Sequence, residues 1–416
     1  MYEKLSAYEK DILSGKEGEA KQLALEILVK IADSVGADGL VEIVSVQAMA
    51  HFGSLHIAGL DWLEKLACMG GKCCVPTTQD PASIPFEKWE EMGYDPGYAE
   101  KQLRLRDAVI QLEQFPAWSC TPYNQGSVPR FGQNVAWAES SAVSYANSVL
   151  GARTNRTPAG LAVCAAISGR APRFGLYLDE NRCAQIKVII DAGELSDLDY
   201  NSIGIILGKK VGNRIPALYG IPQSVTNDNL KYLGAAAASS GSVAMYHILG
   251  VTPEAIMKDP FCGKKPEDEF VVTRRMLNET VASMATKSPG EPELAVTGCP
   301  HSSAAEILRI GKMMEGRKLK TGKAFWIFTN YETDGLMRRM GVVQKLEAAG
   351  VRMMVATCLV ISPLTGNYKT LITDSGKFAN YLPSEHGVEL IYASLNECIQ
   401  AVTEMKEGAN GRKNHP

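Results

Sequence analysis

The sequence lacks the features of a membrane or secreted protein. No apolar run in its 416 residues approaches the roughly 20 residues that a membrane-spanning helix needs. The first residues, Met1-Tyr2-Glu3-Lys4, are charged and are not followed by the apolar core of a signal peptide. We therefore expect a cytoplasmic protein.

An excess of charge of one sign is also absent. Lys and Arg number 43 and Asp and Glu number 46, so nothing indicates nucleic acid or an anionic membrane as the main partner. No G-x-G-x-x-G follows a predicted strand, and there is no G-x-x-x-x-G-K-[ST]. Because such glycine-rich loops hold nucleotide phosphates, their absence argues against a nucleotide-binding protein.

The ten cysteines are spread along the chain, and no two are spaced as C-x-x-C. No zinc ribbon or thioredoxin-type site is therefore evident, and the pattern is not the dense disulfide framework of a small secreted domain. Any metal site must be assembled from cysteines that are distant in sequence. For each cysteine the alternative is a buried free thiol, which behaves as a small hydrophobic residue.

Short apolar segments alternate with helical ones, which predicts an α/β fold with parallel sheets. A content of 45% hydrophobic residues is enough for a large core. The alternation restarts at Leu294, after a more polar connector over 252–292. We expect three regions: an N-terminal α/β region over 1–184, a middle α/β region with the connector over 185–290, and a C-terminal α/β domain over 291–416.

Two cysteines of the C-terminal region, Cys299 and Cys358, each follow a predicted strand. Ligands of α/β proteins bind beyond the carboxyl ends of the strands, so both thiols are candidates for a site. Thr77, Thr78 and Asp80 follow a short predicted strand at 72–75 and are candidates for the same reason. A hydrogen-bonded turn is the alternative for these three residues.

A run of small, mostly uncharged residues over 134–149 predicts a buried helix. Glu139 lies inside it. Since an unpaired buried carboxylate is costly, Glu139 must have a partner or line a polar site. A structural ion pair with a nearby arginine is the alternative to a functional role.

Two arginines and an asparagine, Arg153, Arg156 and Asn155, follow the end of this helix at Gly151. The guanidinium fork matches carboxylate and phosphate groups, so these side chains are suited to holding an anionic substrate. Capping of the helix C-terminus is the alternative.

Several long motifs occur in a fixed order along nearly the whole chain. They are Cys120-Thr121-Pro122-Tyr123, Val128-Pro129-Arg130-Phe131-Gly132, Trp137-Ala138-Glu139-Ser140-Ser141-Ala142, Gly151-Ala152-Arg153-Thr154-Asn155-Arg156, Gly298-Cys299-Pro300-His301, Thr357-Cys358 and Thr373-Asp374-Ser375-Gly376-Lys377. Together they resemble the aconitase X family. The resemblance implies an aconitase-like, multidomain α/β/α fold with an iron–sulfur site at the junction of the domains.

The resemblance also implies the chemistry of a hydro-lyase. Cys120, Cys299 and Cys358 would hold the cluster, either [4Fe–4S] or [2Fe–2S], and three ligands suffice if one iron stays open for substrate. An open iron acts as a Lewis acid on the hydroxyl that leaves, and thiolates are the usual ligands of such clusters.

We assign catalytic roles to Glu139, His301 and Lys377. His301 is only two residues from Cys299, which suits donation to a cluster sulfur or to the substrate hydroxyl. The residues assigned to substrate binding are Ser54, Thr77, Thr78, Arg130, Asn155, Arg156 and Ser375.

The family resemblance implies two candidate substrates. The first is cis-3-hydroxy-L-proline, dehydrated to pyrroline-2-carboxylate, and the alternative is mevalonate 5-phosphate. A phosphate needs additional cations, which Lys323, Arg338, Arg339 and Lys377 offer. A non-catalytic binding subunit is a further alternative, but the presence of all three motif cysteines argues against it.

The family also has a small swivelling part that carries a catalytic serine. Because this chain ends soon after its last predicted α/β unit, we expect a large subunit that needs a small partner, with the base on that partner. The chain departs from the family pattern at Ala356, at His51–His56 and at Asp80, where an acidic residue, another sequence and an asparagine are expected. These departures concern the substrate and leave the three cysteines in place.

Overall fold

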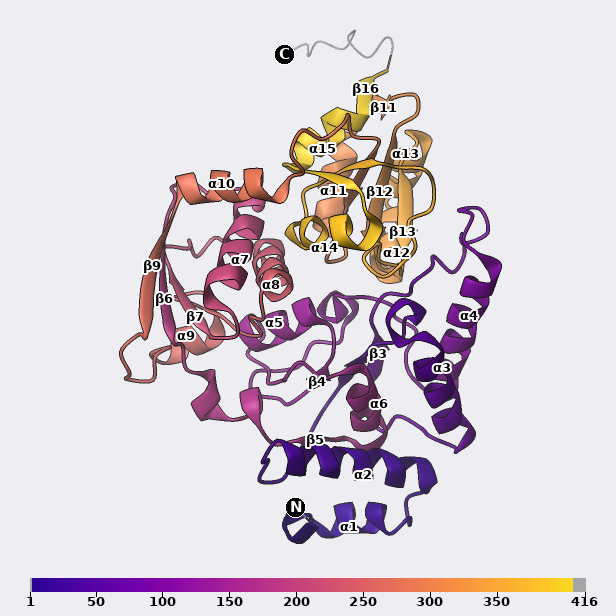
Figure 1. Cartoon of the computed structure of the whole chain (residues 1–416), viewed down its shortest axis with the longest axis vertical. Coiled ribbons are helices and arrows are strands. Elements are labelled where there is room, and N and C mark those ends of the chain that lie inside the picture. The colour runs from indigo at the N-terminus through magenta and orange to yellow at the C-terminus, as the bar shows by residue number, and fades with distance from the viewer. Residues whose placement is uncertain (1, 407–416) are drawn as a thin grey trace.

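The computed structural model describes residues 2–406; residue 1 and residues 407–416, the end of the predicted third region, lie outside it. Helices alternate with parallel strands, which confirms the predicted α/β fold (Figure 1). Three parallel sheets lie in the lower, left and upper parts of Figure 1, while the region boundaries at 184 and 290 stay a prediction. No helix within residues 2–406 has both the length and the apolar content needed to cross a membrane.

The lower sheet is parallel, with the order β3-β2-β4. Its strands are β2 (Val46–Ala48), β3 (Thr77–Gln79) and β4 (Ala136–Trp137). The alternating apolar pattern over 41–46 predicts one strand, which is wrong, because this run is shared between two sheets. Its first part belongs to β1 (Leu40–Glu42), which pairs antiparallel with β5 (Arg170–Pro172).

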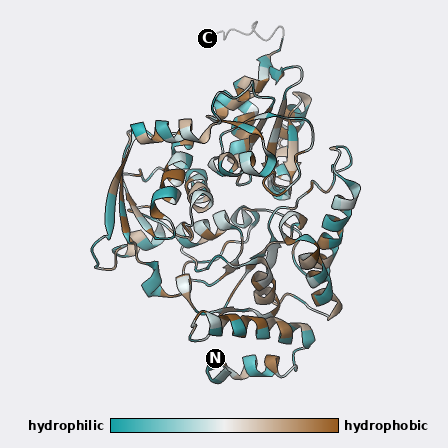
Figure 2. Cartoon of the chain, in the orientation of Figure 1, coloured by the Kyte–Doolittle hydropathy of each residue, from teal (hydrophilic) through white to brown (hydrophobic). Residues whose placement is uncertain are grey.

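The predicted strand at 72–75 is also wrong. The backbone N–H groups of Cys73 and Cys74 donate to Leu112 and Ala166, at or near the ends of two helices, and not to a neighbouring strand. The helices of this part are α1 (Ala7–Leu13), α2 (Glu19–Ser34), α3 (Phe52–Cys68), α4 (Pro96–Gln111), α5 (Ser140–Ser148) and α6 (Ala159–Ser168). Figure 2 shows α2 alternating between hydrophobic and hydrophilic turns, as expected for a helix that buries one face.

The long buried helix predicted over 134–149 is only partly correct. Its first residues form β4, where Ala136 and Ala138 donate backbone hydrogen bonds to Ser45 and Gln47. Glu139 is the N-cap of α5 and not an interior residue, and its carboxylate accepts a 2.8 Å hydrogen bond from the Ala142 N–H. Burial of nearly every residue hid the change from strand to helix, since periodicity separates the two only when one face is exposed.

The left sheet is parallel, with the order β8-β7-β6-β9. Its strands and helices are β6 (Ile186–Asp191), α7 (Asp197–Val211), β7 (Pro216–Tyr219), α8 (Asn227–Ser240), β8 (His247–Ile248), α9 (Pro253–Met257), β9 (Asp268–Thr273) and α10 (Arg274–Met284). The prediction of a connector over 252–292 is wrong in part, because β9 pairs with β6. As an edge strand it exposes Asp268 and Glu269, which explains its polar sequence.

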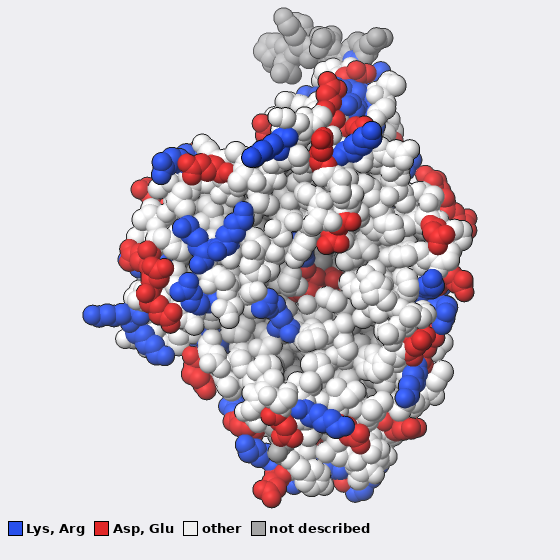
Figure 3. Space-filling view, viewed as in Figure 1, with Lys and Arg blue, Asp and Glu red and all other residues white. Residues whose placement is uncertain are grey.

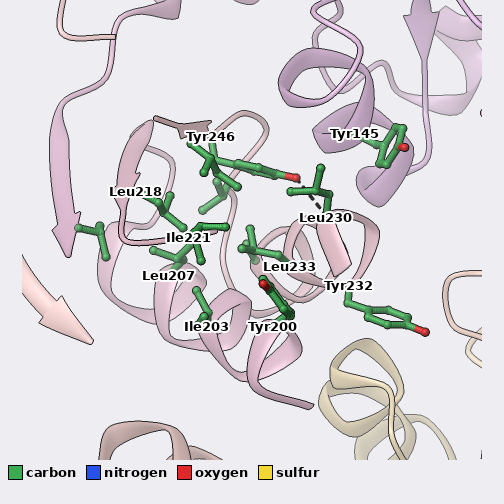
Figure 4. Packing of buried hydrophobic residues seen from close by; sticks show 14 of the residues in the cluster. Tyr145, Tyr200, Ile203, Leu207, Leu218, Ile221, Leu230, Tyr232, Leu233 and Tyr246 are labelled. Carbon is green, nitrogen blue, oxygen red and sulfur yellow. Dashed lines mark hydrogen bonds between the residues drawn. The ribbon is translucent and has the colours of Figure 1, made fainter. Parts of the chain in front are cut away.

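The core of this part packs α7 and α8 against the sheet (Figure 4). Leu207, Leu218 and Leu233 are fully buried there. The Tyr246 hydroxyl, which lies among them, donates a 3.1 Å hydrogen bond to the Leu230 carbonyl at the N-terminal part of α8. The buried hydroxyl is therefore satisfied, and the core carries little polar cost.

The upper sheet has five parallel strands in the order β13-β12-β10-β14-β15. Its elements are β10 (Leu294–Thr297), α11 (Ala304–Met313), β12 (Ala324–Thr329), α12 (Tyr331–Arg339), α13 (Val342–Ala348), β13 (Arg352–Val355), β14 (Thr370–Thr373), α14 (Gly376–His386), β15 (Glu389–Tyr392) and α15 (Leu395–Val402), with a small pair of β11 (Arg317–Leu319) and β16 (Thr403–Met405). The sequence over 336–348 predicts a single helix. The structure has two helices there, because Gly341, between them, has a φ of 71°.

A buried arginine joins the lower and left parts. Arg182 has no exposed side-chain area, and its guanidinium forms a 2.6 Å ion pair with Glu254. It also donates to the Asn147 side chain and to the carbonyls of Asn147, Ala152 and Leu176, at 2.9–3.2 Å. Every donor direction is thus occupied, which is what a buried charge requires.

We expect Arg182→Met to lower the free energy of unfolding by about 3–5 kcal/mol, because the buried Glu254 loses its partner at 2.6 Å and is left with Lys258, which is 3.5 Å away and 42% exposed. Urea denaturation followed by circular dichroism measures this loss. Arg173→Met is the matched control, since Arg173 pairs with Asp38 at an exposed site, and it should change stability little. Equal losses in the two variants would contradict the role given to Arg182.

Candidate iron–sulfur site

The three motif cysteines come from three segments that meet at the carboxyl ends of two sheets. Cys120 lies beside the end of β3, where the Ser119 N–H donates a 2.8 Å hydrogen bond to the Gln79 carbonyl. Cys299 follows β10 and Cys358 follows β13 in the upper sheet. Cys120 and Cys299 are buried, with 5% and 4% of their area exposed. The thiols of Cys299 and Cys358 lie close enough for each to shift the pKa of the other.

His301 connects all three of these segments. It lies on the Cys299 loop, and its backbone N–H donates to the Cys120 sulfur at 3.2 Å. Its ring Nδ1 lies 3.2 Å from the Ser119 hydroxyl, and its Nε2 lies 2.9 Å from the Thr357 carbonyl, next to Cys358. This one residue, through its backbone N–H and its ring, therefore connects the three segments that carry the thiols.

The surroundings of His301 determine its proton positions. A carbonyl oxygen only accepts, so Nε2 carries the hydrogen toward Thr357, and Nδ1 accepts from Ser119. Burial lowers the pKa of His301 to about 4, against the opposing effect of the Thr357 carbonyl. The ring is neutral near pH 7, with both nitrogens already engaged.

An ion pair between Glu139 and Lys377 lies beside the thiols. Glu139 caps α5 of the lower part, and Lys377 is in the first turn of α14 of the upper part. The Glu139 carboxylate also accepts from the Ser140 and Ser141 hydroxyls and the Ala142 N–H. Burial disfavours both charges, but each partner stabilises the other, so the pKa of Glu139 is lowered and that of Lys377 is raised.

The same lysine acts on the thiols. The hydrogen bond from Cys299, and then the Lys377 ammonium, hold the pKa of Cys358 below its ordinary value although burial opposes this. Burial raises the pKa of Cys120 and Cys299, and Lys377 opposes both shifts. The site thus contains one thiol with a lowered pKa and a cation that opposes the rise in the pKa of the other two.

Within residues 2–406, no three His, Cys, Asp or Glu side chains meet closely enough to hold a single metal ion. A cluster makes a different demand, because its cysteines are shared among two or more iron atoms and need not all bind one ion. Two buried thiols and a half-buried one on separate segments, with a lysine beside them, fit that demand, and thiolates are the donors that iron–sulfur clusters use. The residues present therefore fit the group that the motifs imply.

Ser375 links the lysine to one of the cysteines. It is the N-cap of α14, where its hydroxyl oxygen accepts from the Phe378 N–H, and its hydroxyl donates to the Cys299 carbonyl. The substrate-binding residue predicted here is thus also a bridge between the Cys299 loop and the helix of Lys377.

Polar atoms without partners lie at the ends of β2 and β3. Asp80 and His51 are buried, and His51 Nε2 lies 3.6 Å from Asp80 Oδ2. Asp80 Oδ1, His51 Nδ1 and the Thr78 hydroxyl have no hydrogen-bond partner. Thr77 differs, because its hydroxyl donates to the Val75 carbonyl at 2.9 Å.

The other predicted substrate-binding residues are not part of this buried group. Both polar atoms of the Asn155 amide are bonded to the backbone at Phe174 and Leu176. Ser54, Arg130 and Arg156 have exposed side chains. Their roles stay predictions.

Arg153 is held on the protein surface by Asp179 and the Tyr177 carbonyl. The cations considered for a phosphate are also bound elsewhere. Lys323 pairs with Glu291, and Arg338 pairs with Asp334 and Glu347; Arg339 is exposed.

Sequence reasoning missed several residues that hold the site together. Ser119 and Thr357 position His301, and Ser141 donates to Glu139. Each is directly next to a motif cysteine or two residues from Glu139, and this adjacency is the only signal that could have identified it.

On the surface, Figure 3 shows acidic side-chain atoms recessed near the centre of the face in view.

Comparisons with known proteins agree over the whole chain. Sequence models of the aconitase X first, second and third domains match residues 3–180, 184–282 and 292–404. The phosphomevalonate dehydratase large subunit of Methanosarcina mazei is 37% identical, covering 98% of this chain and 99% of that protein. The cis-3-hydroxy-L-proline dehydratase of Pseudomonas aeruginosa is 33% identical, covering 96% of this chain and 70% of that protein.

A solved structure is similar as well. It is the crystal structure of Thermococcus kodakaraensis aconitase X in its holo-form, with a TM-score of 0.87 and 33% identity. The similarity covers 96% of this chain and 99% of that one.

We expect His301→Ala to lower the free energy of unfolding by about 2–4 kcal/mol, because Ser119 and Thr357 lose their buried partner. His386→Ala is the matched control: its ring Nε2 is hydrogen-bonded to the Leu359 carbonyl at 2.7 Å, and the expected loss is about 1 kcal/mol. Urea denaturation measures both values. If the two variants lost the same amount, His301 would not be the connection between the three segments.

Proposed function

The chain belongs to the aconitase X family, whose relatives are dehydratases, and we propose that it is the large subunit of an iron–sulfur hydro-lyase acting on a small hydroxy-carboxylic acid. The observation that carries the proposal is the meeting of Cys120, Cys299 and Cys358 beside the Glu139–Lys377 ion pair. A subunit that only binds a ligand has no need for three thiols, two of them buried, around a lysine.

The three cysteines are the residues that would hold the cluster. When bound, a cluster with an open iron supplies a Lewis acid for the hydroxyl that leaves. Lys377 offsets the negative charge of the thiolates and of the substrate carboxylate, and its cation is fixed in place by Glu139. Such pre-placed charge is the main way in which enzymes stabilise charge that develops during a reaction.

Glu139 acts as a positioning residue in this proposal. Both of its oxygens already accept hydrogen bonds, and its pKa is lowered, so it is a weak proton acceptor. His301 is likewise engaged at both nitrogens. Neither is suited to removing the substrate proton, which favours a base on the small subunit that the names of several relatives imply.

The reaction is an elimination of water. The C–H bond next to the carboxylate breaks and its proton goes to the base, while the C–O bond breaks with its electron pair on oxygen. A C=C bond forms, and no atom is oxidised or reduced overall. From cis-3-hydroxy-L-proline the product is an enamine, which tautomerises to pyrroline-2-carboxylate.

We favour cis-3-hydroxy-L-proline as the substrate. Of the cations considered for a phosphate, only Lys377 lies at the thiols, and it is paired with Glu139; Lys323 and Arg338 are paired elsewhere. Mevalonate 5-phosphate is the second candidate. It is favoured by the large subunits named for that reaction, which are 37–39% identical over 93–98% of this chain.

The first test is iron and acid-labile sulfide content, with a visible absorption spectrum, on protein purified without oxygen. We expect iron and sulfide in comparable amounts, and at least a tenfold lower iron content in Cys120→Ser, Cys299→Ser and Cys358→Ser. Cys164→Ser is the matched control, because Cys164 is buried within α6, and should retain the cluster. Iron-free wild-type protein that cannot be reconstituted would overturn the proposal.

The second test compares the two substrates, using the reconstituted chain together with its small subunit. We expect kcat/KM for cis-3-hydroxy-L-proline to exceed that for mevalonate 5-phosphate by at least tenfold, because of the cations considered within residues 2–406 only Lys377 lies at the thiols, and a single cation that already pairs with Glu139 offsets a carboxylate better than a carboxylate and a phosphate dianion together. The reverse order would replace the first candidate by the second. No turnover of either substrate by a cluster-loaded complex would contradict both.

A further inference from the structure

We propose that Asp80, supported by His51, binds the protonated nitrogen of a hydroxy amino acid substrate and discriminates against phosphorylated substrates. The inference rests on the proposed function and deepens it, because it assigns the substrate class to a residue of this chain. Four observations carry it: the position of Asp80, its unbonded oxygen, its neighbours and the charge around it.

Asp80 lies at the edge of the lower sheet that is nearest to the thiols, the edge formed by the carboxyl ends of its strands. The strands β2, β3 and β4 are parallel, so their carboxyl ends share one edge. Asp80 is the first residue after β3, Glu139 is the second residue after β4, and His51 is the third residue after β2. This edge is where a parallel sheet places ligand-binding residues.

The segment of Asp80 also lies between two of the cysteine segments. On one side, the Gln79 carbonyl accepts from the Ser119 N–H, next to Cys120. On the other side, the Ala82 N–H donates to the Ala356 carbonyl at 2.9 Å, and the Ala82 carbonyl accepts from the Thr357 hydroxyl at 2.9 Å, next to Cys358. Asp80 is thus attached to the site through its backbone on both sides.

The side chain of Asp80 is incompletely bonded. It is 6% exposed, one oxygen lies 3.6 Å from His51, and the other has no partner. The Thr78 hydroxyl, on the same face of the strand because it is two residues away, has no partner either. Unpaired buried acceptors are costly, so these oxygens are suited to a ligand that donates hydrogen bonds.

The charge around Asp80 favours a cation. Within residues 2–406, His51 is the only side chain within ion-pairing distance of Asp80, whereas the nearby Glu139 already has Lys377. Burial raises the pKa of Asp80, and His51 opposes this. A substrate ammonium at the free oxygen would stabilise the ionised carboxylate, and a phosphate dianion would be repelled by it.

A 3-hydroxy-2-amino acid carries the groups that such a site recognises. Its carboxylate matches the Lys377 side of the site, and its ammonium matches Asp80 on the lower-sheet side. Mevalonate 5-phosphate has no nitrogen. The substrate class inferred from Asp80 is therefore a small hydroxy amino acid with a protonated amine.

The test uses a matched pair of ligands on the cluster-loaded full chain. One is cis-3-hydroxy-L-proline, and the other is cis-2-hydroxycyclopentane-1-carboxylate, in which a CH₂ replaces the ring NH₂⁺. Calorimetry gives both Kd values. In the wild type we expect the ammonium ligand to bind at least tenfold more tightly, as for a charge-assisted hydrogen bond. In Asp80→Asn the ratio of the two Kd values, that of the cyclopentane ligand divided by that of cis-3-hydroxy-L-proline, should fall at least fivefold.

Two further variants sharpen the test. His51→Gln should lower the ratio in the same direction by a smaller factor, and Asp38→Asn, at an exposed ion pair with Arg173, should leave it unchanged. With the small subunit present, Asp80→Asn should raise KM for cis-3-hydroxy-L-proline more than it lowers kcat. A visible spectrum and a thermal melt confirm that each variant holds its cluster and is folded.

The outcomes separate the inference from the proposed function. Equal binding of the two ligands to the wild type overturns the inference, even if no Asp80 variant folds. A ratio unchanged in Asp80→Asn overturns it too, as does a loss confined to kcat, which would make Asp80 a proton-transfer group. A complex that holds iron but dehydrates neither candidate substrate refutes the proposed substrates, while the ligand ratio still decides the role of Asp80.

Discussion

The hydrogen bonds of His301 are the constraint on which the rest of the site depends. A cluster needs its cysteines at fixed separations, yet here they come from segments more than 50 residues apart in sequence. The neutral ring connects Ser119 to Thr357, and the backbone N–H of the same residue reaches the Cys120 sulfur. Because a buried hydrogen-bonded network has few alternative arrangements, it holds the three thiols in one geometry.

The buried carboxylates of the site differ in how completely they are bonded. Glu139 and Lys377 neutralise each other across the junction of the lower and upper parts. Asp80 has only the His51 contact at 3.6 Å within ion-pairing distance among the described residues, and its other oxygen remains without a partner. A protein tolerates such a cost most readily where a ligand completes the bonding, which connects the electrostatics of the site to substrate selection.

The fold supplies this arrangement through the ends of its parallel strands. The lower sheet contributes Asp80 and Glu139, and the upper sheet contributes Cys299 and Cys358. Since both sheets direct their carboxyl ends toward the junction, short loops are enough to bring the site together. The buried Arg182 network then fixes the left part against the lower one, far along the chain from the thiols.

The sequence by itself determined the α/β class and the strands of the upper sheet, and its motifs, through the family resemblance, single out the three cysteines as the predicted ligands. Short apolar runs bounded by turns predict strands such as β12 and β14 because local pattern and burial agree there. It also determined that Glu139 needs a partner, since the cost of burying a carboxylate is a property of the residue.

Only the tertiary structure decided that the partner of Glu139 is Lys377. Lys377 lies 238 residues from Glu139, and no local pattern encodes a contact at that separation. The same holds for the division of 134–149 into strand and helix, for the pairing of polar β9 with β6, and for the connections of His301. Each depends on hydrogen bonds between distant segments, which form only when the whole chain has folded.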